Sequence, residues 1–385
     1  MQEVRVGIIG IGNMGISHLK YLQENKIKGA RLTAVLDISE ERVERVKANL
    51  ADGMSIFTTE ADFFQSNLVD AVLIATPHYD HSRIAIKAFE HGLHVLIEKP
   101  AGVYTKQVRE MNKAATASDK VFSIMYNQRT NPLYQKLREL IQSGELGEIR
   151  RINWLITNWY RSQSYYDSGG WRATWAGEGG GVLINQCPHQ LDLWQWMTGM
   201  MPTRMRAFCY FGKHRNIEVE DDVTAFAEYE NGATGVFITT TGEAPGTNRL
   251  EIAGDRGKVV VENGKLDFWQ LRIPEPEFNR EYKGGFGSPE CWKVDIPIKG
   301  EETGHRGITQ NFIDAILKGT ELLTPGEEGI KGLTLSNAMQ LSTWMDDWVD
   351  FPFEEDLYYT HLEERIASSR KKEVKHVTFN VEGTH

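Results

Sequence analysis

A glycine-rich segment after a short apolar run constrains the fold of this 385-residue chain more than any other feature. Val4–Ile9 has the β-branched composition of a buried strand, and a helical pattern over Met14–Leu22 follows it. The residues that join them have the spacing G-x-G-x-x-G: Gly10, Ile11, Gly12, Asn13, Met14 and Gly15. Such glycines permit a tight turn and let the backbone approach a pyrophosphate closely. The segment therefore predicts a dinucleotide site, in which the glycines, Asn13 and Met14 contact the phosphates at a helix N-terminus.

An acidic residue stands at the end of the next predicted strand. Asp37 follows Leu32–Leu36, about 20 residues beyond the glycines, where an acid typically binds the ribose hydroxyls of the cofactor. Its carboxylate would repel the 2′-phosphate of NADP, and no arginine is adjacent in sequence, the nearest one downstream being Arg42. We therefore expect NAD rather than NADP. The alternatives are a structural turn for the glycines and a plain helix N-cap for Asp37.

The first part of the chain alternates short apolar strands with helices. Further strands are predicted over Ala71–Ala75, His94–Ile97 and Val121–Tyr126, and helices over Glu40–Leu50, Asp80–Glu90 and Lys106–Ala117. This alternation is typical of a parallel sheet with helices on both faces. We expect a Rossmann domain over residues 1–126.

The pattern changes to long, half-polar strands after residue 127. These strands are predicted over Glu148–Asn158, Thr203–Phe211, Val223–Tyr229, Thr234–Thr241, Leu250–Ala253 and Lys258–Val261. Asn231-Gly232 and Asn263-Gly264 are strong hairpin signals, which favour an antiparallel sheet. Helices are predicted over Pro132–Ser143, Gly181–Thr198, Ile308–Leu317, Gly326–Asp347 and the charged tail Glu363–Lys372. The overall class is therefore α/β, with an α+β second domain over residues 127–385. Its large open sheet favours a homodimer or homotetramer.

Composition excludes several kinds of partner. The formal net charge of −10 argues against nucleic acid or an anionic membrane. The three cysteines, Cys187, Cys209 and Cys291, have no paired or metal-like spacing, which favours a reducing compartment. No apolar run approaches the roughly 20 residues that span a bilayer, and the N-terminus lacks a signal-peptide pattern. We expect a cytoplasmic protein without a metal site.

A lysine follows a later buried strand. Lys99 stands between Glu98 and Pro100, directly after Val95–Ile97. Because Pro100 restricts the preceding residue to extended conformations, Lys99 leaves the strand in a defined direction. An ammonium at this edge of the sheet can stabilise a developing alkoxide. The alternative is a surface lysine before a loop.

A glycine-rich segment farther along contains a candidate proton acceptor. Gly179, Gly180 and Gly181 precede Asn185, Cys187, Pro188, His189 and Asp192. Asn185, His189 and Asp192 have the spacing i, i+4, i+7, which predicts one helix face. A histidine near neutral pKa can take a hydroxyl proton as hydride leaves. The alternatives for His189 are a core histidine and a metal ligand, although no cysteine–histidine cluster supports a metal.

Further residues border the predicted site. Ala75, Thr76 and Pro77 follow a strand and are expected to contact the cofactor together with His78, His81, Glu98 and Lys99. His78 and His81 are interpreted as structural or cofactor-adjacent rather than catalytic. Between Trp154 and Trp175 lies a run of aromatic residues whose rings can stack on sugar C–H faces. The residues expected to bind substrate are Lys99, Tyr126, Tyr160, Trp171, Arg172, Asn185 and His189.

These ordered motifs resemble the glucose–fructose oxidoreductase and inositol dehydrogenase family, also called Gfo/Idh/MocA. The resemblance rests on Gly10–Gly15, Ala75-Thr76-Pro77, Glu98-Lys99-Pro100 and the triple glycine that leads to His189 and Asp192. It implies a Rossmann domain, an α/β domain whose open sheet mediates oligomerisation, and reversible oxidation of a secondary alcohol on a sugar, inositol or polyol with NAD(P). Lys99 matches the family's lysine and His189 its histidine.

The chain departs from the family pattern at three positions. Family members usually have Asp at Asn185, Gly at Cys187 and Asn at His78. The loss of a negative charge at Asn185 is expected to lower the pKa of His189 and favour its neutral form. The expected mechanism has His189 as general acid/base and Lys99 stabilising the alkoxide. Two alternatives stay open: an NAD-dependent redox cycle that cleaves a glycosidic bond, and a non-catalytic NAD-binding sensor.

Overall fold

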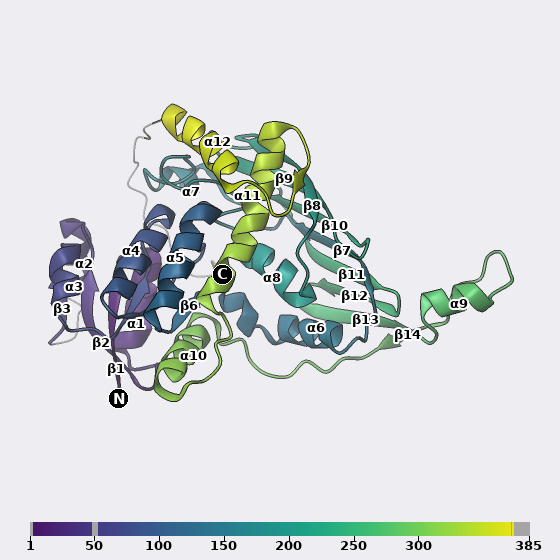
Figure 1. Ribbon diagram of the computed structural model, residues 1–385, viewed down its shortest axis with the longest axis horizontal. Coiled ribbons are helices and arrows are strands. Elements are labelled where there is room, and N and C mark those ends of the chain that lie inside the picture. Colours follow the sequence, from purple (N-terminus) through teal and green to yellow (C-terminus); the bar gives the residue numbers. More distant parts are fainter. Residues whose placement is uncertain (1–2, 48–52, 371, 373–385) are drawn as a thin grey trace.

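The computed structural model describes residues 3–47, 53–370 and 372, and the chain forms two sheets with helices packed on them (Figure 1). The predicted helix end at Leu50 and residue 371 of the predicted tail helix lie outside the described residues. The first sheet has six parallel strands in the order β3-β2-β1-β4-β5-β6. They are β1 (Val4–Ile9), β2 (Ala30–Leu36), β3 (Ser55–Phe57), β4 (Ala71–Ile74), β5 (His94–Ile97) and β6 (Phe122–Ile124). The order reverses between β1 and β4, and open parallel sheets bind ligands at such a point.

Helices cover both faces of this sheet. They are α1 (Asn13–Gln23), α2 (Glu40–Lys47), α3 (Glu60–Gln65), α4 (His78–Glu90) and α5 (Thr105–Ser118). On β5, Val95 and Ile97 belong to the core shared with α4 and α5, whereas Leu96 belongs to the core shared with α1. This alternation follows from the two-residue period of a strand. The predicted Rossmann sheet is confirmed.

A helix from the later chain completes the first unit. In α10 (Gly304–Lys318), Ile308, Phe312 and Ile313 share a core with the β1 residues Val6 and Ile8 (Figure 1). The hydrophobic core of the N-terminal unit therefore includes a segment that follows the second sheet in sequence.

The second sheet has nine strands in the order β14-β13-β12-β11-β7-β10-β9-β8-β15. They are β7 (Ile149–Ile156), β8 (Arg204–Phe211), β9 (Glu220–Glu228), β10 (Thr234–Thr240), β11 (Asn248–Gly254), β12 (Gly257–Glu262), β13 (Lys265–Leu271), β14 (Cys291–Val294) and β15 (Val349–Asp350). Among the described strand pairs of this second sheet, only β7 and β10 run parallel. Asn231-Gly232 joins β9 to β10 and Asn263-Gly264 joins β12 to β13, as predicted. The mostly antiparallel sheet is confirmed.

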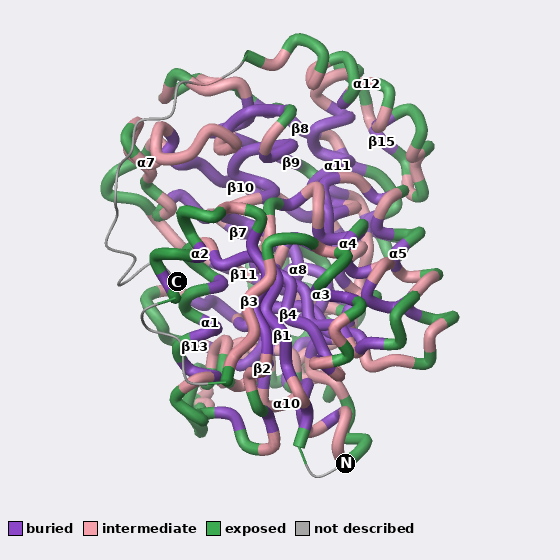
Figure 2. Tube along the Cα trace, turned by 90° about the vertical axis from the view of Figure 1, so that its left-hand side faces the viewer, coloured by how far each residue is buried: buried purple, intermediate pink, exposed green. Residues whose placement is uncertain are grey.

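One face of this sheet is covered by α6 (Pro132–Gln142), α8 (Pro188–Thr198) and α11 (Gly329–Met345), and its strands are buried (Figure 2). The other face exposes Phe208, Tyr210 and Phe226. The remaining helical elements are η1 (Asn127–Thr130), α7 (Gln163–Asp167), α9 (Glu275–Glu281), η2 (Gly326–Glu328) and α12 (Glu355–Ser368). Figure 1 shows α9 extending away from the body beyond β14.

The predicted helix over Gly181–Thr198 is wrong in its first part, because α8 begins only at Pro188. The Glu220 carboxylate accepts hydrogen bonds from the N–H groups of Gly181 (2.8 Å) and Leu183 (3.2 Å), which holds this segment in turns. Proline at the first helical position then fits the start of α8. Asn185 therefore precedes the helix, and the predicted common face with His189 and Asp192 does not form.

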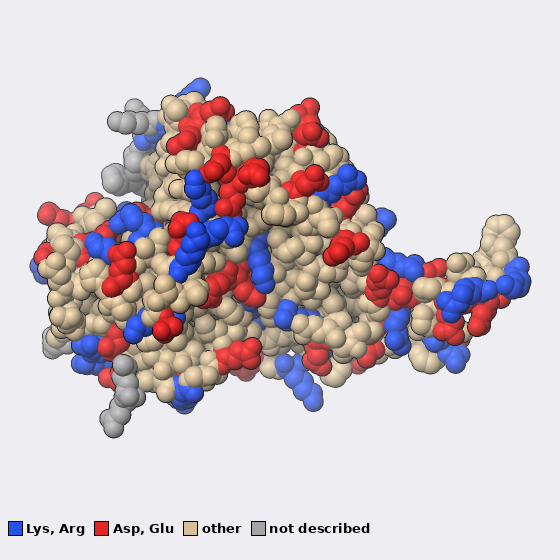
Figure 3. All heavy atoms as spheres, in the orientation of Figure 1, with Lys and Arg blue, Asp and Glu red and all other residues tan. Residues whose placement is uncertain are grey.

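In the described part of the chain, no helix is long and apolar enough to cross a membrane, and no group of three His, Cys, Asp or Glu side chains could hold a metal ion. Acidic and basic side chains are interspersed on the face shown in Figure 3.

Candidate active site

The glycines after β1 form a cradle that fits a pyrophosphate. Gly10 has φ +90°, and a Cβ there would lie 2.7 Å from the carbonyl oxygen of Ala75. A Cβ at Gly15 would lie 1.9 Å from the carbonyl oxygen of Gly10, whereas one at Gly12 would meet nothing within 4 Å. Gly12 also caps α1 without a side-chain hydrogen bond, so no capping side chain satisfies the first N–H groups of the helix, at Asn13 and Met14. The space and the donors suit the diphosphate of a dinucleotide.

Asp37 is buried beside this turn. Its Oδ2 accepts a hydrogen bond from the N–H of Ile11 (2.9 Å), and its Oδ1 accepts one from the N–H of Ser39 (2.8 Å). The guanidinium of Arg42, which the sequence separates from Asp37, lies 3.4 Å away in space because α2 brings it back. A buried carboxylate and a nearby cation therefore lie together beside the glycine turn.

The loop after β4 carries Ala75, Thr76 and Pro77 to the same edge of the sheet. The ring nitrogens of His81 lie 2.9 Å from the carbonyl oxygen of Thr76 and 2.7 Å from that of Pro100. His81 therefore ties the β4 loop to the β5 loop, and burial lowers its pKa. This structural position agrees with the interpretation made from the sequence.

His78 connects the first sheet to the loop between α7 and α8. Its Nδ1 lies 3.2 Å from the carbonyl oxygen of Glu178, and its ring packs edge-on against Trp171 at 5.5 Å. Burial, followed by the charge of nearby groups, places its pKa well below the ordinary histidine value. The loop between α7 and α8 thus packs against the carboxyl edge of the first sheet.

Glu98 is fixed by a buried chain of polar groups. Its Oε1 lies 2.6 Å from Nε2 of His18, whose Nδ1 is 2.5 Å from the hydroxyl of Tyr21. The Tyr21 hydroxyl is in turn 2.8 Å from Oγ1 of Thr309 on α10. Burial alone would raise the pKa of Glu98, but the hydrogen bond and charge of His18 lower it to about 2. An ionised carboxylate is therefore held next to Lys99.

Lys99 joins the two units of the molecule. Its Nζ donates a 2.9 Å hydrogen bond to the backbone carbonyl oxygen of Asn185. Burial lowers the pKa of Lys99, while the carboxylates of Glu98 and Glu178 act in the opposite direction. The ammonium is thus poorly solvated and available to a developing negative charge.

His189 lies in the first turn of α8 and is buried. Its Nδ1 has no hydrogen-bond partner among the described residues. Burial and then the charge of Lys99 lower its pKa well below the ordinary value, so the ring is neutral at pH 7. The lowered pKa of His189 has the direction expected from the sequence. Its largest cause, however, is burial of the ring and not the loss of charge at Asn185. A buried, unpaired nitrogen beside an ammonium is suited to exchange a proton.

Sequence reasoning missed Glu178, which lies at the centre of this site. Its Oε1 accepts a close hydrogen bond from Nδ2 of Asn185, and its Oε2 accepts one from the N–H of Ala173 (2.6 Å). Burial raises its pKa, against the charges of Arg172 and Lys99. In the sequence, Glu178 is marked only by its position directly before three glycines. That position does not indicate a contact with Asn185.

Tyr165 contacts polar side chains of the loop between α7 and α8. Its hydroxyl accepts a hydrogen bond from Nη1 of Arg172 (2.8 Å) and lies 3.4 Å from Nδ2 of Asn185. Trp171 packs on the Arg172 guanidinium at 4.7 Å from the ring centroid. The structure therefore brings together Lys99, Arg172, Asn185, His189 and, at the loop, Trp171.

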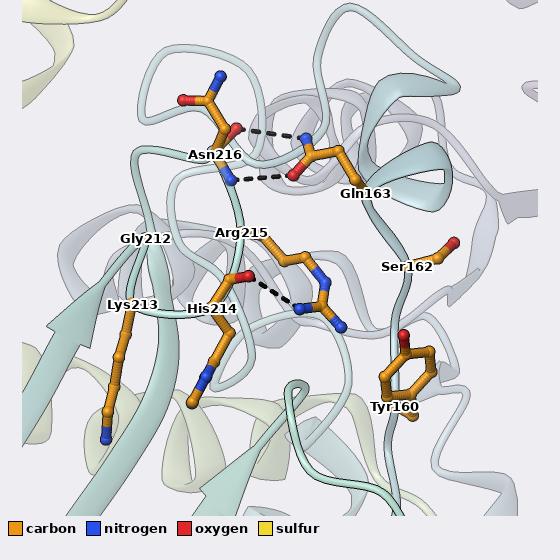
Figure 4. Close-up of a pocket in the computed structure, with 8 residues that line it drawn as sticks. All are labelled: Tyr160, Ser162, Gln163, Gly212, Lys213, His214, Arg215 and Asn216. Carbon is orange, nitrogen blue, oxygen red and sulfur yellow. Dashed lines mark hydrogen bonds between the residues drawn. The ribbon is translucent and has the colours of Figure 1, made fainter.

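Tyr126 and Tyr160, which were also predicted to bind substrate, form no hydrogen bond with these residues in the described structure. Tyr160 is half exposed at a shallow cleft of about 650 Å³, where the Arg215 guanidinium packs on its ring at 5.1 Å (Figure 4). Tyr126 is buried behind His189 and its hydroxyl donates to the carbonyl oxygen of Gly329 (3.4 Å).

Asp192 also lies apart from the site, although the sequence pattern grouped it with His189. It forms a buried ion pair with Arg129 at 2.6 Å, so its carboxylate holds α8 to η1.

Comparisons with known proteins agree with this arrangement. A family model described as "Oxidoreductase family, NAD-binding Rossmann fold" matches residues 4–126, and one described as "GFO/IDH/MocA C-terminal domain" matches residues 134–260. Inositol 2-dehydrogenase of Rhodococcus erythropolis is 35% identical over 323 residues, which cover 81% of this chain and 87% of that protein.

Other relatives match over less of their length. The rhizopine catabolism protein MocA of Rhizobium meliloti is 30% identical over 207 residues, covering 54% of this chain and 61% of that protein. The chain thus spans only a little over half the length of this and similar relatives. A crystal structure of the WlbA dehydrogenase from Bordetella pertussis in complex with NADH and UDP-GlcNAcA matches with a TM-score of 0.77 at 25% identity, covering 91% of this chain and 100% of that one. The chain belongs to the GFO/IDH/MocA family of oxidoreductases, with an NAD-binding Rossmann domain followed by the C-terminal domain of that family.

Proposed function

We propose that this protein is an NAD-dependent dehydrogenase that interconverts a secondary alcohol and a ketone on a sugar, inositol or related polyol. The observation that carries the proposal is the pairing of a buried ammonium, Lys99, with a buried neutral imidazole, His189, whose Nδ1 is unpaired in the described structure. The names of the relatives support the substrate class, since they include inositol and levoglucosan dehydrogenases.

His189 acts as general base in the direction of oxidation and as general acid in reverse. Its depressed pKa keeps the ring neutral, so it can accept the hydroxyl proton. Lys99 stabilises the negative charge that develops on the alcohol oxygen. When bound, the nicotinamide cofactor supplies the hydride acceptor.

The walls of the site provide contacts for a hydroxylated ring. Trp171 presents an aromatic face, and the amide of Asn185 can hydrogen-bond a hydroxyl group. Arg172 and the half-exposed Tyr160 extend the binding surface toward the cleft of Figure 4. Tyr126 supports His189 from behind, since their rings are 6.2 Å apart.

We propose NAD rather than NADP as the cofactor because the carboxylate of Asp37, at the end of β2, would repel a 2′-phosphate. The cradle that would hold it comprises Gly10, Gly12, Asn13, Met14, Gly15, Asp37, Ala75, Thr76, Pro77, His78, His81, Glu98 and Lys99. Arg42, which pairs with Asp37, could partly offset the repulsion of a phosphate. Calorimetric titration with both cofactors tests this preference, and a tighter dissociation constant for NADP would contradict it.

The open sheet face points to self-association. Phe208, Tyr210 and Phe226 expose aromatic surface on adjacent strands β8 and β9, which a second copy can cover. We propose a homodimer or homotetramer through this face, and light scattering on the purified protein measures the mass directly.

The test of the reaction is the appearance of reduced nicotinamide absorbance when the protein and NAD meet a panel of inositols, aldoses, uronates and glycosides. Lys99→Met should abolish this signal while NAD still binds by calorimetry. Full turnover by Lys99→Met would remove Lys99 from the mechanism. Cleavage of a glycoside without net NADH would replace the dehydrogenase proposal by the redox-cycle alternative.

A further inference from the structure

In the described structure, three arginines without ion-pair partners lie near Lys99 (Arg161 and Arg172) or beside the cleft of Figure 4 (Arg215). The Arg161 guanidinium donates to the carbonyl oxygen of Tyr160 (2.9 Å), and that of Arg172 donates to the Tyr165 hydroxyl (2.8 Å). Arg215 donates through Nε to the carbonyl oxygen of Arg161 (2.8 Å). All of these acceptors are neutral. Within the described residues, none of the three arginines forms an ion pair, although each is only partly exposed.

The buried arginine Arg129 differs from these three because it has acidic partners. Arg129 is paired with two carboxylates, Asp192 and Glu328, each at 2.6 Å. Partly buried cations are costly to leave without a counter-charge, and paired arginines satisfy that requirement within the fold. Arg161, Arg172 and Arg215 have no such ion pair among the described residues.

These cations form one continuous positive region with the catalytic lysine. The guanidinium carbons of Arg161 and Arg172 lie 5.2 Å and 4.7 Å from the centroid of the Tyr165 ring. After burial and the opposing carboxylates, both arginines contribute to the lowered pKa of Lys99, so their charges reach it.

Nearby carboxylates offset only part of this charge. Lys372 adds no net charge, since its Nζ lies 3.5 Å from the carbonyl oxygen of Arg172 but also 3.8 Å from Oδ1 of Asp167. The Glu178 carboxylate, which accepts hydrogen bonds from Ala173 and Asn185, opposes the charges of Arg172 and Lys99. The four cations Lys99, Arg161, Arg172 and Arg215 outnumber the carboxylates Glu98 and Glu178, so the region keeps an excess of positive charge.

We infer that the substrate carries an anionic group, a carboxylate or a phosphate, which Arg161 and Arg172 bind while its reacting carbinol faces Lys99 and His189. This inference rests on the proposed function and names the substrate class of the same site. Arginine suits the role because its planar fork matches the paired oxygens of both anions. The cleft of Figure 4, which Arg215 lines beside Arg161, leaves room for a larger anionic substituent.

Matched pairs of sugars that differ in charge test the inference on the NADH-saturated protein by calorimetry. For the carboxylate the pair is D-glucuronate and its neutral amide, and for the phosphate it is D-glucose 6-phosphate and D-glucose. At least one anion should bind about tenfold or more tightly than its neutral partner, as expected of charge-assisted hydrogen bonds. The pair of sugars that shows this difference in affinity identifies the anion as a carboxylate or a phosphate.

Variants connect the preference to the two arginines. Arg161→Gln and Arg172→Gln should each reduce the anion preference by about tenfold, whereas Arg280→Gln on the exposed helix α9 removes the same charge without effect. Equal binding of both members of each pair, or no binding of either anion, would overturn the inference. So would a loss confined to NAD affinity in the Arg161 and Arg172 variants, because the cofactor diphosphate would then be their ligand.

The same experiment separates this inference from the proposed function. NADH formation from neutral polyols at rates equal to those from acidic sugars would leave the dehydrogenase in place and remove the anion preference. Tight, arginine-dependent binding of an acidic sugar without any NADH formation would keep the anion site and contradict the dehydrogenase.

Discussion

The Lys99 ammonium donates a 2.9 Å hydrogen bond to the backbone carbonyl oxygen of Asn185, a residue 86 positions later in the chain. This contact links the carboxyl edge of the parallel sheet to the turn before α8. It brings the lysine close enough to His189 for its charge to lower the pKa of the ring. The candidate active site is thus assembled from both units of the molecule.

The pH dependence of oxidation should reflect these two groups. Because the pKa of His189 is lowered, the neutral base persists below pH 6.5, and the acidic limb of kcat/KM should fall below that value. Because the pKa of Lys99 is lowered from 10.5, the alkaline limb should appear below pH 10.5. Steady-state rates over a wide pH range measure both limbs. An acidic limb above pH 6.5 would exclude His189 as the base.

Glu178 should act on Lys99 through charge. Its carboxylate raises the pKa of Lys99, so Glu178→Gln should move the alkaline limb of kcat/KM to lower pH. Glu178→Asp keeps the charge and serves as the control. An unchanged alkaline limb in Glu178→Gln, with normal folding, would assign Glu178 a purely structural role.

The contact between Glu178 and Asn185 predicts a reciprocal rescue. Asn185→Asp should place two carboxyl groups in contact and lower the free energy of unfolding by roughly 1–3 kcal/mol, because Glu178 loses its amide donor. Adding Glu178→Gln should restore a carboxylate–amide pair and recover most of that loss. Urea unfolding of the single and double variants measures the coupling, and additive losses would contradict it.

Two glycines of the cofactor turn should respond differently to alanine. Gly15→Ala places a Cβ 1.9 Å from the carbonyl oxygen of Gly10. This clash should lower the free energy of unfolding by about 1–3 kcal/mol. Gly12→Ala meets no protein atom within 4 Å, so stability should change by less than about 1 kcal/mol.

The added methyl of Gly12→Ala occupies the space assigned to the pyrophosphate. The dissociation constant for NAD should therefore rise by about tenfold or more. Denaturation and calorimetry on the same variants separate the two effects. Unchanged NAD affinity in Gly12→Ala would place the diphosphate elsewhere.

The buried pair of Arg129 and Asp192 should be a major contributor to stability. Arg129→Met leaves the Asp192 carboxylate buried without its partner, which should cost about 3–5 kcal/mol of unfolding free energy. The exposed pair of Arg45 and Glu41 provides the control, since Arg45→Ala should cost only about 0.3–0.5 kcal/mol. Similar losses in both variants on chemical denaturation would contradict the structural role of Asp192.

Much of the fold could be predicted because its signals are local. Strands buried on both faces, such as β1, β4 and β5, appear as continuous apolar runs, and the Asn-Gly turns identify two hairpins. The strands β3 and β15 were not predicted, because strands this short show no periodic pattern of apolar residues. The first half of the predicted helix over Gly181–Thr198 failed because Glu220, distant in sequence, captures its N–H groups.

The sequence by itself determined the two fold classes and the order of the motifs, and it identified Lys99, His189 and the glycines Gly10, Gly12 and Gly15 as candidates for the site. These features depend on residues within a few positions of one another. Only the tertiary structure decided that Asp192 pairs with Arg129, that α10 completes the first core and that Glu178 holds Asn185. It also decided that Arg161 and Arg172 meet around Tyr165 without an ion-pair partner among the described residues. Contacts between different elements of the fold leave no periodic pattern in the chain, because they arise from the packing of whole elements.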